Sequence, residues 1–416
     1  MLCYNACVKL NYCRNGCACS AAFVRLHPCC LRLFGMFGYM KNNIYDNNAV
    51  KRRNKTIFVA TIVFLAVLAC YIGSAFLIEI VQRDFRADVS FEGKYKNIIL
   101  MIGDGMGFNH IDCAEDYYNE PSFMRTAALG CSEVVTDSKM LFFPTDSAAS
   151  ATALSTGEKT DNGAIARLRG KNIPTNAELA KALGMAVGII ATEGVNGATP
   201  AAFSSHADNR GDADDIFAGQ LKSNIDLFAG GNRARYDELK DRITESGYEY
   251  LNDFSFDFDT AKKIWGAYDI KSLQSSEGNG VTLAELAVKA MNYLENVSEN
   301  GYFMMIEESY IDKRSHANDI YGMLEKFKSY DQAVKAVVER ARTSGDTLVI
   351  VTADHETGKL FLPSSDRANP SDKWFKSAGH TRRHVPCFYY SPVGELPRVI
   401  DNTQIADMCR YFIENR

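Results

Sequence analysis

The chain has 416 residues, a formal net charge of -5 and 46% hydrophobic residues. This length allows a large buried core in one domain or two. The mildly acidic balance argues against nucleic acid as a partner, because proteins that bind nucleic acid usually display a basic surface.

The first thirty residues are rich in cysteine. They hold seven of the twelve cysteines, at irregular spacing and with a single nearby histidine, His27. This pattern matches a zinc module poorly. We therefore expect residues 1–55 to be a disordered, cysteine-rich and basic cytosolic tail. The alternative is a wrongly assigned start, with Met36 or Met40 as the true first residue.

An uncharged apolar run of 22 residues follows, from Ile57 to Ile78. It is long enough to cross a bilayer as a helix. Residues 51–55 before it are mostly basic, so the positive-inside rule places the N-terminus in the cytosol. We expect residues 56–80 to be a transmembrane signal anchor and 81–95 a linker, with the rest on the extracytoplasmic side. A cleaved signal is the alternative, although no small-residue cleavage site stands out.

From residue 96 to residue 416, apolar runs of strand length alternate with helical patterns. The predicted strands are 97–102, 186–191, 225–229, 302–306, 347–351 and 385–390. The predicted helices include 175–183, 283–296, 320–344 and 404–414. This alternation predicts an α/β domain with a mostly parallel central sheet and helices on both faces. Residues 232–280 are the least regular, and we expect them to form surface decoration.

Carboxylates and imidazoles stand near the ends of several predicted strands. In an open α/β sheet, ligands bind at the carboxyl ends of the strands. A single Asp-His pair there is more often a turn or a cap, and we expect His110 and His206 to be ordinary residues. Repetition along one chain instead predicts a metal site with mixed ligands. The candidates are Asp104, Glu307, Asp312, His316, Asp354, His355 and His380.

Asp146 and Ser147 stand where an Ala-rich helix of small residues would begin. A helix N-terminus offers free N–H groups and a positive dipole end, which suit a phosphoryl oxygen. An ordinary N-cap explains the same two residues equally well. The residues alone therefore leave both interpretations open.

Six segments together resemble, in order, the motifs of the alkaline phosphatases. They are Gly103-Asp104-Gly105-Met106-Gly107, Thr145-Asp146-Ser147-Ala148-Ala149-Ser150-Ala151-Thr152-Ala153, Ala198-Thr199-Pro200-Ala201, Ile311-Asp312-Lys313 with His316, Thr352-Ala353-Asp354-His355-Glu356-Thr357-Gly358 and Gly379-His380-Thr381. The resemblance extends from about residue 96 to the C-terminus. It implies an alkaline-phosphatase-like fold and the hydrolysis of small phosphate monoesters. A phosphodiesterase or another hydrolase of the same superfamily is the alternative.

The resemblance also implies residue roles. Ser147 would be the catalytic nucleophile that becomes phosphoserine. Arg210 would hold two phosphate oxygens, a planar bidentate task that suits a guanidinium. Lys313 matches a substrate-binding position that is Lys in some members and His in others. A catalytically silent phosphate-binding protein is disfavoured, because no residue expected of the nucleophile or the zinc ligands is missing.

Three metal ions follow from the same resemblance. One zinc would be held by Asp312, His316 and His380, and a second zinc by Asp104, Asp354 and His355. A third site, usually magnesium, would use Asp104, Thr199 and Glu307.

Three features depart from the family pattern. Gly197 stands where Asp or His usually supports the third metal, which makes magnesium the least secure of the three ions. Glu308 replaces a usual glycine and would add a charge beside that site. Only about 25 residues separate His355 from His380, which leaves little room for the crown-like insert of larger members. We therefore expect a compact variant whose contacts, if it forms a homodimer, differ from theirs.

Overall fold

The structure, a computed structural model, describes residues 58–73, 89–140, 142–252, 262–268 and 281–416. The chain divides into two units, Met1–Phe76 and Leu77–Arg416. In the first unit, residues 58–73 are helical, while the cysteine-rich tail and the two ends of the apolar run lie outside the described residues. Within the described residues, no helix combines the length and the apolar character that a membrane crossing requires.

The second unit contains a ten-stranded sheet in the order β14-β2-β13-β10-β1-β9-β5-β6-β8-β7. Its strands are β1 (Asn97–Gly103), β2 (Gly130–Val135), β5 (Ala186–Ala191), β6 (Leu227–Gly230), β7 (Tyr248–Leu251), β8 (Lys263–Ala267), β9 (Tyr302–Glu308), β10 (Thr347–Thr352), β13 (Val385–Tyr389) and β14 (Val399–Asp401). Neighbouring strands from β10 to β7 are parallel, and β13 is antiparallel to β10 and β2. The predicted α/β fold with a mostly parallel sheet is thus confirmed.

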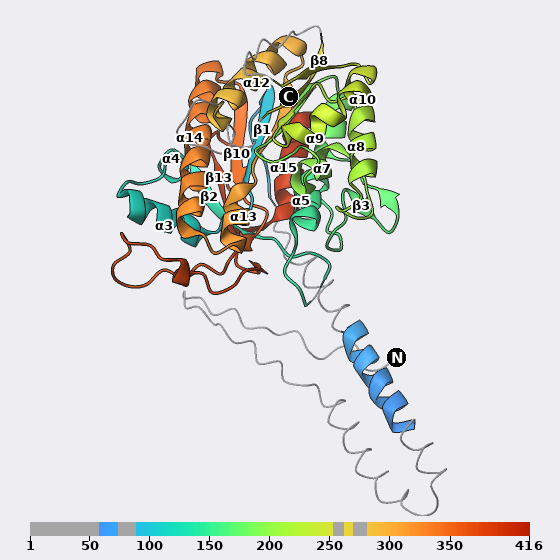
Figure 1. Cartoon of the computed structure of the whole chain (residues 1–416), viewed down its shortest axis with the longest axis vertical. Helices are drawn as coiled ribbons and strands as arrows, with labels where there is room; N and C mark the ends of the chain where they lie inside the picture. Colours follow the sequence, from blue (N-terminus) through green and yellow to red (C-terminus); the bar gives the residue numbers. More distant parts are fainter. Residues whose placement is uncertain (1–57, 74–88, 141, 253–261, 269–280) are drawn as a thin grey trace, which may run out of the picture. The chain divides into compact units, whose positions relative to one another are not determined.

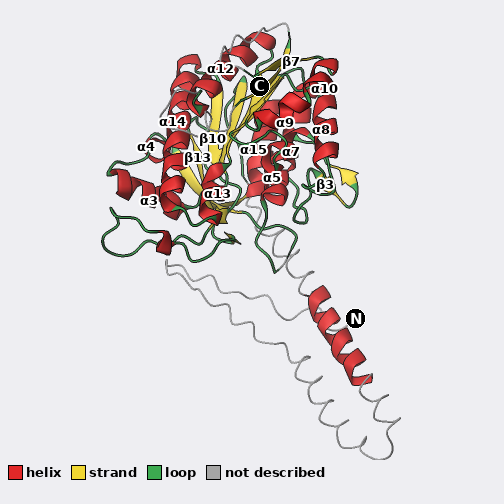
Figure 2. Ribbon diagram, viewed as in Figure 1, coloured by secondary structure: helices red, strands yellow, loops and turns green. Residues whose placement is uncertain are grey.

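Helices cover both faces of this sheet (Figures 1 and 2). The long helices α12 and α14 pack together on one face, whereas α5, α7 and α15 lie on the other. The helices are α3 (Phe108–Tyr118), α4 (Phe123–Thr126), α5 (Ser147–Thr156), α6 (Asn176–Ala182), α7 (Ala198–Ser204), α8 (Ala213–Lys222), α9 (Arg233–Glu238), α10 (Lys240–Glu245), α12 (Leu283–Val297), α13 (Tyr310–His316), α14 (Ile320–Ser344) and α15 (Asn402–Glu414).

Local sequence explains both the apolar strands and the helix ends. Every residue of β1, β5, β9 and β10 is buried, which is why these strands read as unbroken apolar runs. At the start of α14, the side chain of Asp319 accepts a hydrogen bond from the N–H of Gly322. The helix ends at Gly345, whose φ of 74° suits a left-handed C-cap.

The expectation that residues 232–280 are surface decoration is wrong for part of that segment. Strands β7 and β8 extend the main sheet at the β6 edge. The indole of Trp265 on β8 is completely buried and lies 4.6 Å from the ring of Phe228 and 5.4 Å from that of Tyr236, centroid to centroid. This aromatic packing, which short-range patterns do not reveal, stabilises the added strands.

Candidate metal and phosphate site

Three neighbouring strands end at one edge of the sheet and deliver the predicted ligands there. Ile102 of β1 pairs with Glu307 of β9 on one side and with Thr352 of β10 on the other. Helix α13, directly after β9, contributes further ligands, and the short ribbon of β11 (Glu356–Thr357) and β12 (His380–Thr381) lies across from it. The predicted residues that meet at this end of the strands are Asp104, Ser147, Thr199, Glu307, Asp312, His316, Asp354, His355 and His380.

One set of ligands consists of Asp104, Asp354 and His355, as predicted. Their ligating atoms all lie within 4.8 Å of one another, and all three residues are buried. The Nε2 atom of His355 is 3.5 Å from Oδ1 of Asp104 and 3.2 Å from Oδ2 of Asp354. The same Nε2 lies 3.2 Å from Oγ of Ser147. The expected nucleophile therefore touches this set directly.

The second set brings together Asp312, His316 and His380. The Nε2 atoms of the two imidazoles are 3.0 Å apart, and each lies 3.3 to 3.6 Å from a carboxylate oxygen of Asp312. Their Nδ1 atoms face backbone carbonyls, those of Ala378 at 2.5 Å and Thr145 at 2.8 Å. In each imidazole, Nδ1–H donates to a backbone carbonyl, so Nε2 carries a lone pair, and the two lone pairs face each other. A cation bound to both Nε2 atoms would remove this repulsion.

The electrostatics of the first set also fit a cation. Burial and then the charge of Asp312 raise the pKa of Asp354 to about 7. Burial and then the neighbouring carboxylates raise the pKa of Asp104 well above its ordinary value. Oδ1 of Asp104 and Oδ2 of Asp354 are buried and accept no hydrogen bond. Burial, followed by the nearby His380 and His316, lowers the pKa of His355 well below its ordinary value. Neutral imidazoles and unpaired carboxylates suit divalent metal ions.

Ser147 is free to act because another residue caps its helix. Asp146 is the N-cap of α5, and its carboxylate accepts hydrogen bonds from the N–H groups of Ala149 and Gly163. Ser147 is the first helical residue, 4% exposed, and its hydroxyl faces His355. Arg210 Nη1 lies 3.3 Å from Asp146 Oδ2, which holds the guanidinium beside the start of the same helix. The sequence left open whether Asp146 and Ser147 form an N-cap or a reactive site. In the structure Asp146 is the N-cap, and Ser147 faces the candidate metal ligands.

The residues of the expected third site lie on the β9 side of Asp104. The carboxylate of Glu307 accepts a hydrogen bond from Ser309 Oγ at 2.7 Å. Burial raises the pKa of Glu307 to about 8. Thr199 lies in the first turn of α7 and is 1% exposed. Glu308 does not add its charge there. Its carboxylate instead bonds Thr192 Oγ1 at 3.1 Å and the N–H of Tyr310 at 3.0 Å, because successive strand residues face opposite ways.

Some contacts of the site were not predicted. Lys313 forms an ion pair with Glu193, with 2.7 Å between Nζ and Oε1. Thr357 Oγ1 lies 3.2 Å from His355 Nδ1 and also hydrogen-bonds Asp312. Thr357 lies inside the motif at residues 352–358, so the sequence could have identified it as a site residue. No spacing rule pointed to Glu193.

The two histidines expected to be ordinary residues lie outside both ligand sets. His206 contacts Glu178 and the carbonyl of Ala166, each at 2.8 Å. His110 is buried, accepts a hydrogen bond from the N–H of Gly107, and has Nε2 3.1 Å from Ser315 Oγ.

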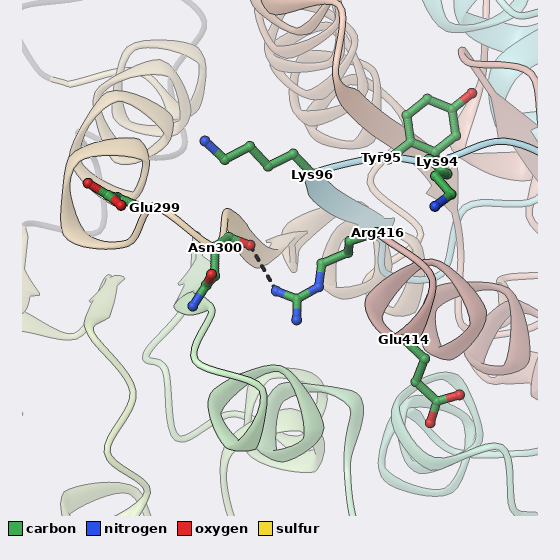
Figure 3. A pocket seen from close by; sticks show the side chains of 7 residues that line it. All are labelled: Lys94, Tyr95, Lys96, Glu299, Asn300, Glu414 and Arg416. Carbon is green, nitrogen blue, oxygen red and sulfur yellow. Dashed lines mark hydrogen bonds between the residues drawn. The ribbon is translucent and has the colours of Figure 1, made fainter.

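A separate hollow lies near the amino ends of the strands (Figure 3). It has a volume of about 430 Å³ and is lined by Lys94, Tyr95, Lys96, Glu299, Asn300, Glu414 and Arg416. Lys96 directly precedes β1 and Asn300 lies shortly before β9, so this hollow is at the opposite end of the sheet from the metal ligands. Its mixed charges and its distance from Ser147 give it no part in the chemistry of that serine.

The fold and this site define an α/β protein in which ligands suited to divalent metal ions lie beside a serine at a helix N-terminus. Comparison with known proteins identifies it further. The alkaline phosphatase family profile matches residues 95–407. Alkaline phosphatase 3 of Bacillus subtilis is 32% identical over 358 residues, which cover 78% of this chain and 72% of the relative. The chain belongs to the alkaline phosphatase family, and it is a metal-dependent phosphoric monoester hydrolase.

Solved structures agree with this assignment. The alkaline phosphatase of the Antarctic bacterium TAB5 aligns with a TM-score of 0.68 and 27% identity, covering 78% of this chain and all of the other. A variant of the TAB5 enzyme, in which glutamate replaces a histidine, aligns with a TM-score of 0.66 and 28% identity over 78% of this chain and 99% of the other. That variant was solved with magnesium bound in its M3 site.

Proposed function

We propose that this chain hydrolyses small phosphate monoesters in two steps, through a covalent phosphoserine at Ser147, with two zinc ions and one magnesium ion. The observation that supports this most directly is the position of Ser147 Oγ, 3.2 Å from His355 Nε2 and at the start of α5. An oxygen nucleophile, a metal-ligand set and a helix N-terminus are thereby available to one phosphoryl group.

In the first step, Ser147 Oγ forms a bond to phosphorus while the ester P–O bond breaks and the alcohol leaves. In the second step, water attacks the phosphoserine, releases inorganic phosphate and restores the serine hydroxyl. Arg210 donates hydrogen bonds to two phosphoryl oxygens, and the free N–H groups of α5 favour the same negative charge. Preorganised donors of this kind stabilise the charge that develops in the transition state.

The proposed zinc ions are held by the two sets described above, one by Asp312, His316 and His380 and the other by Asp104, Asp354 and His355. When bound, zinc would make the serine alkoxide accessible near neutral pH and stabilise the leaving oxygen. The magnesium site would use Asp104, Thr199 and Glu307. Its assignment to magnesium is supported by oxygen-only ligands and by the metal found in the TAB5 variant.

A direct test is hydrolysis of p-nitrophenyl phosphate by the purified full chain at alkaline pH. We expect activity that EDTA removes and that zinc, with magnesium, restores. Bis(p-nitrophenyl) phosphate serves as the matched diester. Hydrolysis of the diester but not the monoester would preserve the fold and the metal sites but refute the proposed substrate class.

We also propose that the apolar run Ile57–Ile78 anchors the chain in a membrane, with the phosphatase unit on the extracytoplasmic side. The support is its uncharged length in the sequence and the basic residues 51–55 before it. The full chain should then stay with membranes after extraction at high pH and dissolve in detergent. Release into the aqueous fraction without detergent would refute the anchor.

A further inference from the structure

The loop between β5 and α7 contains an acidic side chain near the third site. This loop carries Glu193, and it ends at Gly197, the N-cap of α7. Gly197 offers no side chain where the family pattern has an acid or an imidazole. If a Cβ were added there, it would lie 3.5 Å from Oε2 of Glu193 and 3.6 Å from its Cδ. The carboxylate of Glu193 thus lies next to the space that a side chain at position 197 would enter.

Glu193 is held in this place by two contacts. Its Oε1 pairs with Nζ of Lys313 at 2.7 Å. Its backbone N–H lies 3.4 Å from Oγ of Ser309, the hydroxyl that donates to the carboxylate of Glu307 at 2.7 Å. Of the two carboxylate oxygens of Glu193, Oε1 pairs with Lys313, and Oε2 is the one that faces Gly197.

The surroundings of the third site hold more negative charge than Lys313 can balance. Asp104 and Glu307 are buried carboxylates, and Glu193 adds a third at their margin. Oδ1 of Asp104 is buried without a hydrogen bond, and the hydroxyl of Thr199, which is 1% exposed, faces the carboxylate of Glu307. This cluster of buried oxygen atoms, which is independent of Glu193, fits a hard divalent cation.

In the described residues, two groups of ligand atoms lie within 4.8 Å of one another, and Glu193 belongs to neither. They are Asp104, Asp354 and His355 in one group and Asp312, His355 and His380 in the other. Magnesium usually keeps several waters when it binds to proteins. A carboxylate at the margin of the site can accept hydrogen bonds from such waters and orient them.

We propose that Glu193 replaces the missing side chain at position 197 as the acidic partner of the third cation site, accepting hydrogen bonds from the hydration shell of magnesium while Lys313 holds it in place. This inference rests on the proposed function of the third site. It assigns to a residue four positions earlier in the chain, on the same loop, the role that Gly197 cannot perform. The competing explanation is an ordinary surface ion pair, since the side chains of Lys313 and Glu193 are 42% and 37% exposed.

The test measures magnesium affinity by calorimetry on the zinc-loaded full chain, a readout that does not depend on turnover. Glu193→Gln preserves the shape of the side chain and removes its charge. We expect magnesium to bind about 10- to 100-fold more weakly, the usual effect of losing a partner of a metal ligand shell. The double variant Glu193→Gln with Gly197→Asp returns a carboxylate to the loop and should recover most of the affinity. The control is Glu249→Gln, which breaks a comparable Lys-Glu pair on β7.

Four results would overturn the inference. The first two are wild-type affinity in Glu193→Gln and an equal loss in Glu249→Gln. The other two are a loss that the double variant does not restore and a wild-type chain that binds no magnesium. Failure of the proposed function is distinguishable, because it would show as absent p-nitrophenyl phosphate hydrolysis by the wild-type chain, whatever its magnesium affinity.

Discussion

Removing the metal ions should make the stability of the folded chain fall as the pH rises. Once metal is removed, burial and carboxylate repulsion raise the pKa of Asp354 from 3.8 to about 7 and that of Glu307 from 4.5 to about 8. The folded state therefore holds these protons more tightly than the unfolded state does. Their stabilising contribution is present below about pH 4 and is lost progressively as the pH rises through 7 to 8. Bound metal abolishes this dependence, because it binds the deprotonated carboxylates.

The size of the effect follows from the same values. A shift of about three pKa units corresponds to roughly 4 kcal/mol for each carboxyl. The two losses add to less than twice that, because protonating one group relieves the repulsion on the other. A loss of about 4 kcal/mol is a large fraction of the 5–15 kcal/mol that typically separates folded from unfolded protein. For the unit Leu77–Arg416, whose unfolding entropy is about 0.7 kcal/mol/K, this lowers the Tm by roughly 6 °C.

The measurement is the Tm by differential scanning calorimetry from pH 5.5 to pH 9, with EDTA and with zinc and magnesium. Asp354→Asn should reduce the decrease of Tm with pH that is measured in EDTA, since it removes one of the two carboxyl groups. Asp214→Asn, at a side chain 85% exposed, is the control and should leave the slope unchanged. Equal slopes with and without metal, or a metal-free Tm that rises with pH, would refute the reasoning.

Three further variants test the site and the fold. Ser147→Ala should lower turnover at least about a thousandfold while zinc content, measured by atomic absorption, stays close to wild type, and near-normal turnover would disprove the serine assignment. Arg210→Ala should weaken inhibition by inorganic phosphate about 10- to 100-fold through loss of charged hydrogen bonds, whereas Arg167→Ala, whose guanidinium pairs with Asp208, should not. Trp265→Ala should cost about 3–5 kcal/mol in urea unfolding, because it empties a completely buried site, and a loss below 1 kcal/mol would mean that β8 is dispensable.

The sequence was most informative where the fold depends on uninterrupted burial. The predicted strand at 186–191 matches β5 at both ends, and the helix at 320–344 matches α14. Both carry strong local signals, an unbroken apolar run in the first and a long amphipathic pattern with an Asp cap in the second. Strand β2 had no such signal, because its exposed and buried residues are mixed and it pairs with β13 and β14, which come much later in the chain.

In the candidate site, the sequence identified the chemical groups but not all of their partners. The resemblance to the family motifs implied that Asp312, His316 and His380 lie together, and the structure brings them within 3.6 Å of one another. Glu193 has no characteristic spacing to Lys313, so their ion pair depends on how the β5 loop packs beside α13. The direction of Glu308 was also mispredicted, because adjacency in the sequence suggested a shared site where strand geometry separates the two glutamates.

The position of β1 in the sheet places Asp104 where it can contribute to two of the proposed metal sites. This strand lies between β9 and β10, so the residues after it face the carboxyl ends of both neighbours. The N–H of Asp104 donates to the carbonyl of Glu308 at 3.0 Å, and the N–H of Gly105 donates to the carboxylate of Asp354 at 3.1 Å. The turn that follows β1 is thereby hydrogen-bonded to the end of β9 and to the segment that follows β10.

Gly105 is required for that turn. Its φ is +76°, and an added Cβ would lie 2.8 Å from Cα of Asp312. A side chain at this position would therefore push α13 away from the end of β1. Asp312 would then move away from the imidazole of His380, which it contacts. The close approach of Gly105 to α13 thus keeps the two ligand sets adjacent, as the proposed two-metal mechanism at Ser147 requires.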